Sequence, residues 1–269
     1  MYNSYRTMEN IIKQIVKLNS KDYLEFLNKR IKSFTEVEYF KPSYNERKTV
    51  VTTKFFGKES KIVSGYAPLV LDDDSAYFLL FDKIKELSSN YNLDNPLDVD
   101  KLSVLAVQTS VFQYFGNGAP NDVVRTLLYR NSFKKDEDLS ISKFKGSNQS
   151  MCTERSALAQ NYFKLLGYDC SYLSGVVFLN GQKDLHAFNV VRFSDKTKIF
   201  DLVCTPINST TKNLPSPIMC NLNYDLSSKA LTDGEMDNLD VPYINFQSQS
   251  GKYHCISYGN LDKFQMADE

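Results

Sequence analysis

The residue best placed for nucleophilic chemistry is Cys152, which stands at the expected start of a helix over residues 151–166. Ser150 is a good N-cap residue and would put Cys152 in the first helical turn. Backbone N–H groups and the positive end of the helix dipole stabilise a thiolate at that position. Glu154 is expected on the solvent side of this helix, so that Cys152 faces the body of the protein.

A reactive thiol needs a base, and the chain has two histidines, His186 and His254. His186 stands in an alternating run that predicts a strand over 184–193. The next expected strand, 197–204, carries Asp201 within an apolar run, where a carboxylate is costly unless it has a charged or hydrogen-bonding partner. Orienting the imidazole of His186 would supply that partner. A thiol at a helix start, followed by an imidazole and a carboxylate on successive strands, is the order of a Cys-His-Asp triad for acyl transfer.

The register of these two strands decides how Asp201 lies relative to His186. For the two residues to be directly opposite, the hairpin must be centred between Phe193 and Ser194. The turn-like residues 194–197 are centred two residues later. A β-bulge or a wider loop would reconcile the two.

Other chemistries receive less support from the sequence. His254 and Cys255 are adjacent in an expected strand, so their side chains point to opposite faces and we interpret them as structural. The aspartates at 72–74 are interpreted as the start of a helix rather than a cation site. No nucleotide-binding glycine loop is found, and four cysteines lack zinc-ligand spacing: Cys170, Cys204, Cys220 and Cys255.

The elements around these residues are predicted from periodicity and turn residues. Helices are expected at 9–32 (as two helices broken near Asn19-Ser20), 76–88, 99–115 and 120–132. Strands are expected at 47–56, 60–71, 170–179, 184–193, 197–204 and 252–258, and the remainder of 205–269 is loop-rich. The polar segment 88–98 is the expected boundary between an N-terminal region, residues 1–95, and a second domain, residues 96–269.

The composition is that of an ordinary globular protein. The 269 residues include 32 basic and 32 acidic side chains, and this balance disfavours nucleic-acid binding by bulk electrostatics. No apolar run approaches the roughly 20 residues that span a bilayer. Five cysteines without a signal peptide argue against a disulfide framework. We expect a cytoplasmic protein without membrane insertion, and secretion by a route that needs no signal peptide stays open.

Residues 148–206 resemble the bacterial transglutaminase-like family. The first part of that pattern is a cysteine, a small residue five later, a helix closed by Leu-Gly and a strand ending in Ser-Gly. In this chain the matching residues are Cys152, Ala157, Leu166-Gly167 and Ser174-Gly175, and Cys170 and Leu173 also match. The run from His186 to Val191 is similar to the family's His-Ala-aromatic-Asn-x-Val strand. Asp201 stands where the family's aspartate follows a short lysine-bearing hairpin.

The resemblance implies an α+β fold with a papain-like, transglutaminase-like core, in which the nucleophile helix packs on an antiparallel sheet, and an N-terminal mixed α/β extension. It implies Cys152 as nucleophile, His186 as general base and then acid, and Asp201 as the orienting residue. No metal or organic cofactor would be needed. The oxyanion hole would be the Cys152 backbone N–H with Gln149 as second donor. A protein or peptide substrate is expected.

The departures from the family bear on the reaction. Ser150 replaces a usual glycine and Phe188 a usual tryptophan, and the chain has no tryptophan to line the acyl-donor tunnel of crosslinking members. Hydrolysis of a peptide or amide bond is therefore favoured over glutamine–amine crosslinking. An arylamine-type N-acetyltransferase shares the triad order and the glutamate at Glu154, and a non-catalytic binding protein on the same fold is a further alternative. Asn189 and the short interval from cysteine to histidine favour the transglutaminase-like interpretation.

Overall fold

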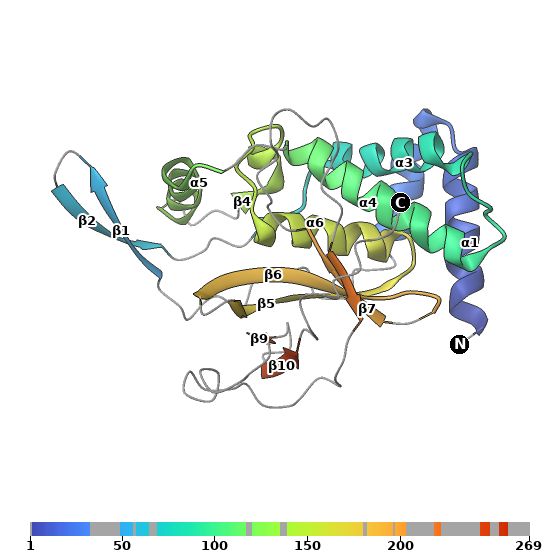
Figure 1. Ribbon diagram of the computed structural model, residues 1–269. Coiled ribbons are helices and arrows are strands. Elements are labelled where there is room, and N and C mark those ends of the chain that lie inside the picture. The colour runs from blue at the N-terminus through green and yellow to red at the C-terminus, as the bar shows by residue number, and fades with distance from the viewer. Residues whose placement is uncertain are drawn as a thin grey trace.

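The protein has an α+β arrangement, with helices gathered on one side of an antiparallel sheet (Figure 1). The computed structural model describes residues 2–32, 49–55, 58–64, 69–116, 120–134, 139–179, 182–195, 197–202, 218–221, 243–247 and 253–257. The statements below concern these residues.

The helices agree closely with the periodicity of the sequence. The predicted break near Asn19-Ser20 is confirmed, because a short 3-10 turn separates the first two helices. The helices are α1 (Tyr2–Lys17), α2 (Tyr23–Lys32), α3 (Asp74–Ser88), α4 (Pro96–Phe115), α5 (Asp122–Lys134) and α6 (Cys152–Leu165), with 3-10 turns η1 (Ser20–Asp22) and η3 (Ile141–Phe144). None of the helices in the described residues is long and apolar enough to cross a membrane.

The main sheet has six strands in the order β10-β9-β5-β6-β7-β8, and every neighbouring pair is antiparallel. Its strands are β5 (Asp169–Leu179), β6 (Gln182–Arg192), β7 (Thr197–Asp201), β8 (Ile218–Asn221), β9 (Tyr243–Gln247) and β10 (Tyr253–Ser257). Three of the four strands predicted after residue 169 form its centre. The expectation that most of 205–269 is loop misses β8 and β9.

Two smaller pairings lie outside this sheet. The hairpin predicted around Gly57 is confirmed as β1 (Thr49–Phe55) paired with β2 (Lys58–Ser64). Strand β3 (Leu69–Val70) pairs in parallel with β4 (Leu139–Ser140), which ties the segment before α3 to the segment before α6. The parallel pair therefore brings the segment before α3 next to the one that leads to Cys152.

One apolar core joins the helices to the sheet. It contains buried side chains from α1, α3, α4, α6 and strands β5 to β7, among them Ile12, Phe81, Val107, Phe163 and Phe200. Its members come from both sides of residue 95, so α1 and α3 pack on α4 directly. The division expected at that residue stays a prediction.

Helix α6 ends in a specific local structure at Gly167. At its C-terminal end Gly167 adopts φ +93, and its N–H donates to the Lys164 carbonyl oxygen (2.9 Å). A left-handed residue after the last turn is a common way to end a helix, and glycine adopts it without a Cβ penalty. The chain then turns back into β5 beneath the helix.

Candidate active site

Cys152 is the first residue of α6 and lies in its first turn, as the sequence predicts. The expected N-cap is wrong by one residue, because Met151 and not Ser150 holds that position. The reason is that the Ser150 hydroxyl accepts a hydrogen bond from Arg155 Nε (3.0 Å), while the Met151 N–H donates to Glu154 Oε2 (2.8 Å). The Cys152 side chain is partly buried and packs against the edge of the core.

The face of α6 that carries Cys152 is turned towards strand β6. One turn further along this face, Ser156 Oγ donates to the Ala187 carbonyl oxygen (3.0 Å), and Asn189 Nδ2 donates to the Ser156 carbonyl oxygen (3.0 Å). Residues four apart lie on the same side of a helix. Cys152 therefore lies on the sheet-facing side of α6.

The direction of α6 sets which part of β6 is level with Cys152. Ser156 contacts β6 at Ala187, and the Phe163 ring lies 5.9 Å from that of Phe193, so the helix and the strand run the same way. Four helical residues rise about 6 Å, which corresponds to roughly two strand residues. Cys152 is thus level with the β6 backbone at Leu185 and His186.

His186 itself is described only by its backbone, which pairs with Gly175 of β5. Its side chain lies outside the described part of the structure. The strand predicted around it is confirmed as β6. The proximity of its imidazole to Cys152 therefore stays a prediction.

The β6–β7 register places Asp201 near His186 but not directly opposite. Asn189 pairs with Phe200, so the next pair along the ladder is Phe188 with Asp201. The hairpin is centred between Ser194 and Asp195, one residue away from each of the two centres that the sequence suggests. Asp201 is thus two residues short of the position facing His186.

Asp201 belongs to the face of the sheet that points away from α6. Its neighbour Phe200 packs on the α6 residue Phe163, with ring centroids 4.9 Å apart, and successive strand residues point to opposite faces. The Asp201 side chain is buried, as expected for a carboxylate in an apolar strand, with 4% of the residue exposed. The structure thus brings Cys152 and β6 together from one side, and Asp201 adjoins β6 on the other.

A buried polar contact fixes the β6–β7 hairpin against α4. The Ser194 N–H donates to Asp100 Oδ2 (2.8 Å), and the Tyr168 hydroxyl donates to Asp100 Oδ1 (2.8 Å). Burial raises the pKa of Asp100, and the hydrogen bonds from Ser194 and Tyr168 oppose that rise. The contact holds the hairpin in one register, and the sequence gives no sign of it.

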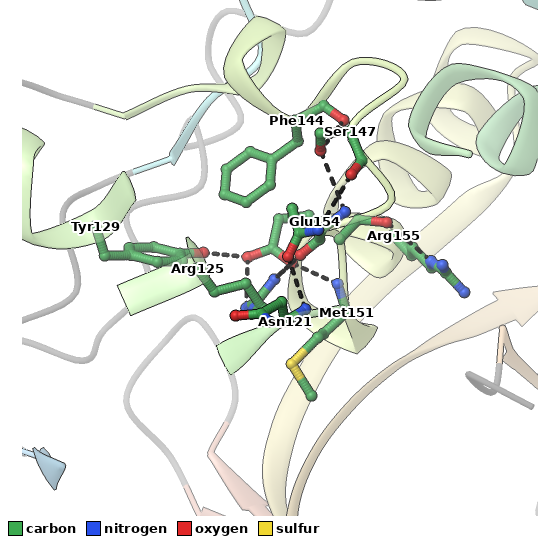
Figure 2. A network of polar contacts seen from close by, with 10 residues as sticks. Asn121, Arg125, Tyr129, Phe144, Ser147, Met151, Glu154 and Arg155 are labelled. Carbon is green, nitrogen blue, oxygen red and sulfur yellow. Dashed lines mark hydrogen bonds and ion pairs between the residues drawn. The ribbon is translucent and has the colours of Figure 1, made fainter. Parts of the chain in front are cut away.

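A second polar cluster surrounds Glu154 at the start of α6 (Figure 2). The prediction that Glu154 faces solvent is wrong, because α5 covers that side of the helix and the side chain is fully buried. Arg125 of α5 forms a bidentate pair with it, Nη1 to Oε2 at 2.9 Å and Nη2 to Oε1 at 3.1 Å. The Tyr129 hydroxyl also donates to Glu154.

The Glu154 cluster holds its charges as a balanced pair. Burial lowers the pKa of Arg125, but the Glu154 carboxylate outweighs this and leaves that pKa above its ordinary value. Burial raises the pKa of Tyr129, so its hydroxyl stays a neutral donor. Arg125 Nη1 also donates to the Gln149 carbonyl oxygen (2.5 Å). One guanidinium therefore clamps both the helix and the loop that leads into Cys152.

The predicted oxyanion donor Gln149 is engaged within its own loop. Its Nε2 donates to the Ser147 carbonyl oxygen (3.2 Å), and its Oε1 accepts from the Asn121 N–H (2.7 Å). The side-chain amide thus joins the loop before α6 to the start of α5. Its role in an oxyanion hole stays a prediction.

The structure also describes several other residues whose types could do chemistry. Asp73 is the N-cap of α3 and accepts from the Ser75 N–H (3.0 Å), which confirms the helix start predicted at the three aspartates. Cys170 is buried under α6, and burial raises the pKa of its thiol. His254 and Cys255 lie in β10 at the sheet edge. Among the described residues, no group of histidine, cysteine or acidic side chains could hold a metal ion.

Comparison with known proteins gives one slight structural likeness. No protein-family profile matches the sequence, and no curated protein matches it. The structure is similar to an arylamine N-acetyltransferase from Salmonella typhimurium, at 14% identity and a TM-score of 0.26. The match covers 57% of this chain and 64% of that chain. A likeness of this size assigns neither family nor activity.

Proposed function

We propose that this protein is a cysteine-dependent acyl-transfer enzyme that hydrolyses a peptide or amide bond in a protein or peptide substrate. The observation that carries the proposal is the place of Cys152, the first residue of a helix, partly buried, on the face turned to β6 and level with His186. A helix of this kind packed on an antiparallel sheet also supports the papain-like, transglutaminase-like core that the sequence pattern implies.

In the proposed reaction the Cys152 thiolate attacks the substrate carbonyl carbon after its proton passes to His186. The imidazolium then gives that proton to the leaving amine, and a thioester forms. Water, deprotonated by His186, attacks the thioester and releases the acid and the free thiol. Asp201 adjoins β6 on the face turned away from α6, and it is proposed to accept from the imidazole nitrogen opposite the one that takes the Cys152 proton.

The start of α6 supplies the electrostatic part of this mechanism. Among the described residues the Cys152 N–H has no hydrogen-bond partner, as is usual for the first N–H groups of a helix. It is proposed to donate to the oxyanion of the tetrahedral intermediate. The clamp from Arg125 to Glu154 and the Gln149 carbonyl fixes this N–H in place.

The reaction is tested first by thiol reactivity. We expect iodoacetamide at neutral pH to label Cys152 faster than the other four cysteines, and faster than the buried Cys170 above all. His186→Ala should slow the labelling of Cys152 and leave that of Cys170 unchanged, because the imidazole assists ionisation of the nearby thiol alone. Equal rates for Cys152 and Cys170 would refute the proposal.

The type of acyl transfer is tested by the fate of the thioester. A library of peptide amides is offered to the wild-type enzyme and to Cys152→Ala, with and without added primary amine, and products are read by mass spectrometry. Hydrolysis predicts acid products that do not change when amine is added. Amine adducts in place of acid would establish crosslinking or acetyl-type transfer instead. If no product depends on Cys152, the result would favour a non-catalytic binding protein.

A further inference from the structure

Arg155 is a buried cation beside Cys152 whose charge has no acidic partner among the described residues. It lies on α6 three residues after Cys152, and 3% of the residue is exposed. Its Nε donates to Ser150 Oγ (3.0 Å), and its guanidinium lies 4.8 Å from the centre of the Phe112 ring. An arginine side chain cannot lose its proton in a protein, so this charge persists.

The nearest acidic residue in sequence does not neutralise Arg155. Glu154 gives its two oxygens to Arg125, Tyr129 and the Met151 N–H. Figure 2 shows the Arg155 side chain leading away from that cluster. Burial of a charge without a partner costs several kcal/mol in general, so a site that keeps one is expected to use it.

The guanidinium is directed to the end of α6 where Cys152 lies. Side chains of a helix tilt towards its N-terminus, and residues three apart are neighbours on its surface. The bond to Ser150, two residues before Cys152, confirms this direction. The Phe112 ring of α4 lies over the guanidinium, and its Nη1 and Nη2 groups make no hydrogen bond to a described residue.

We propose that Arg155 binds a carboxylate of the substrate and holds it beside the carbonyl carbon that Cys152 attacks. The planar fork of a guanidinium matches a carboxylate in two parallel hydrogen bonds, as Arg125 does with Glu154 in the same structure. The substrate class is thereby narrowed to acyl compounds that carry an acidic group near the reacting bond. This inference rests on the proposed function of Cys152.

Two alkylating reagents of the same size separate recognition from reactivity. Iodoacetamide is neutral, whereas iodoacetate carries a carboxylate, and both alkylate the same thiol. The ratio of their rates at Cys152, read by peptide mass spectrometry, reports carboxylate recognition. We expect Arg155→Met to lower the iodoacetate-to-iodoacetamide ratio by at least about tenfold. The matched control is Arg192→Met, an exposed arginine at the end of β6, which should leave the ratio unchanged.

A second test uses the wild-type protein, so it does not require that any variant folds correctly. At equal ionic strength, propionate should protect Cys152 from iodoacetamide, whereas propionamide should not. Arg155→Lys keeps the charge without the fork and should retain part of the iodoacetate preference. An unchanged ratio in Arg155→Met, or equal protection by the two propionyl compounds, would overturn carboxylate recognition. Slow labelling of Cys152 by iodoacetamide itself would instead overturn the proposed function.

Discussion

Removal of the Glu154 carboxylate is the sharpest test of the buried cluster that holds the start of α6. In Glu154→Ala the guanidinium of Arg125 loses both oxygens of its bidentate pair, while 11% of its side chain is exposed to water. Breaking one partner of a buried ion pair costs about 3–5 kcal/mol, because the other charge stays buried. Against a total stability of about 5–15 kcal/mol this is a large fraction.

The assay is urea unfolding followed by circular dichroism, with the midpoint converted to a free energy through the slope. The matched control is Glu86→Ala on α3, which removes an exposed partner of Lys83 at 2.5 Å and should change the free energy of unfolding by about 0.5 kcal/mol or less. A double variant, Arg125→Met with Glu154→Leu, removes both charges and should be more stable than Glu154→Ala.

If Glu154→Ala lowers the free energy of unfolding by no more than Glu86→Ala does, then Glu154 is solvated in solution and the Arg125 clamp does not hold α6. A double variant less stable than Glu154→Ala would instead show that Arg125 stabilises the protein without Glu154, through contacts such as the one to the Gln149 carbonyl oxygen. The first result would remove the fixed geometry on which the Cys152 mechanism relies.

Three further changes test other parts of the structure. Gly167→Ala should cost about 1–3 kcal/mol in urea unfolding, because a side chain is strained at φ +93 and the added Cβ would lie 2.9 Å from Ile11 Cδ1. Asp73→Ala should cost about 1 kcal/mol at neutral pH. Burial raises the pKa of Asp73, but its hydrogen bonds lower that pKa by more, so the net pKa in the folded protein is lowered. The stability that Asp73 contributes should therefore disappear as the pH falls through this lowered pKa. At that pH the wild-type protein and Asp73→Ala should have the same free energy of unfolding. Asp201→Asn should slow iodoacetamide labelling of Cys152, whereas Asp195→Asn on the exposed hairpin should not; equal rates would exclude Asp201 from the mechanism.

The start of α6 is predictable from the sequence to within one residue, whereas the environment of Glu154 is not. A polar loop before Cys152 and the Leu-Gly pair at Gly167 are local signals, and they bound the helix at both ends. The burial of Glu154 depends on α5, a separate segment of the chain that packs against α6. Its signal in the sequence is a glutamate three residues after the N-cap, a spacing that favours a bond back to the N-cap N–H.

The register of β6 and β7 likewise depends partly on local sequence and partly on a contact from a distant segment. Alternation predicts both strands, but the turn-like residues favour a hairpin centre one residue beyond the observed one. The buried carboxylate of Asp100, which accepts from the Ser194 N–H, fixes the observed register from α4. Strands β8 and β9 are four and five residues long, and such short strands form because an edge of the sheet is available to pair with them.

The charges around the first turn of α6 link the proposed reaction to the proposed substrate. Arg125 and Glu154 cancel, and since Arg155 meets no acidic side chain among the residues that the structure describes, it adds one positive charge near Cys152. That charge can balance a Cys152 thiolate before substrate arrives. In the proposed reaction a substrate carboxylate then takes the guanidinium, and the imidazolium of His186 stays as the counter-ion of the thiolate. When the thioester forms, the sulfur becomes neutral and Arg155 is balanced by the bound carboxylate alone. The proposed roles are thus divided, with Arg155 serving the substrate carboxylate and His186 serving the sulfur, provided that the carboxylate and the acyl group belong to the same substrate.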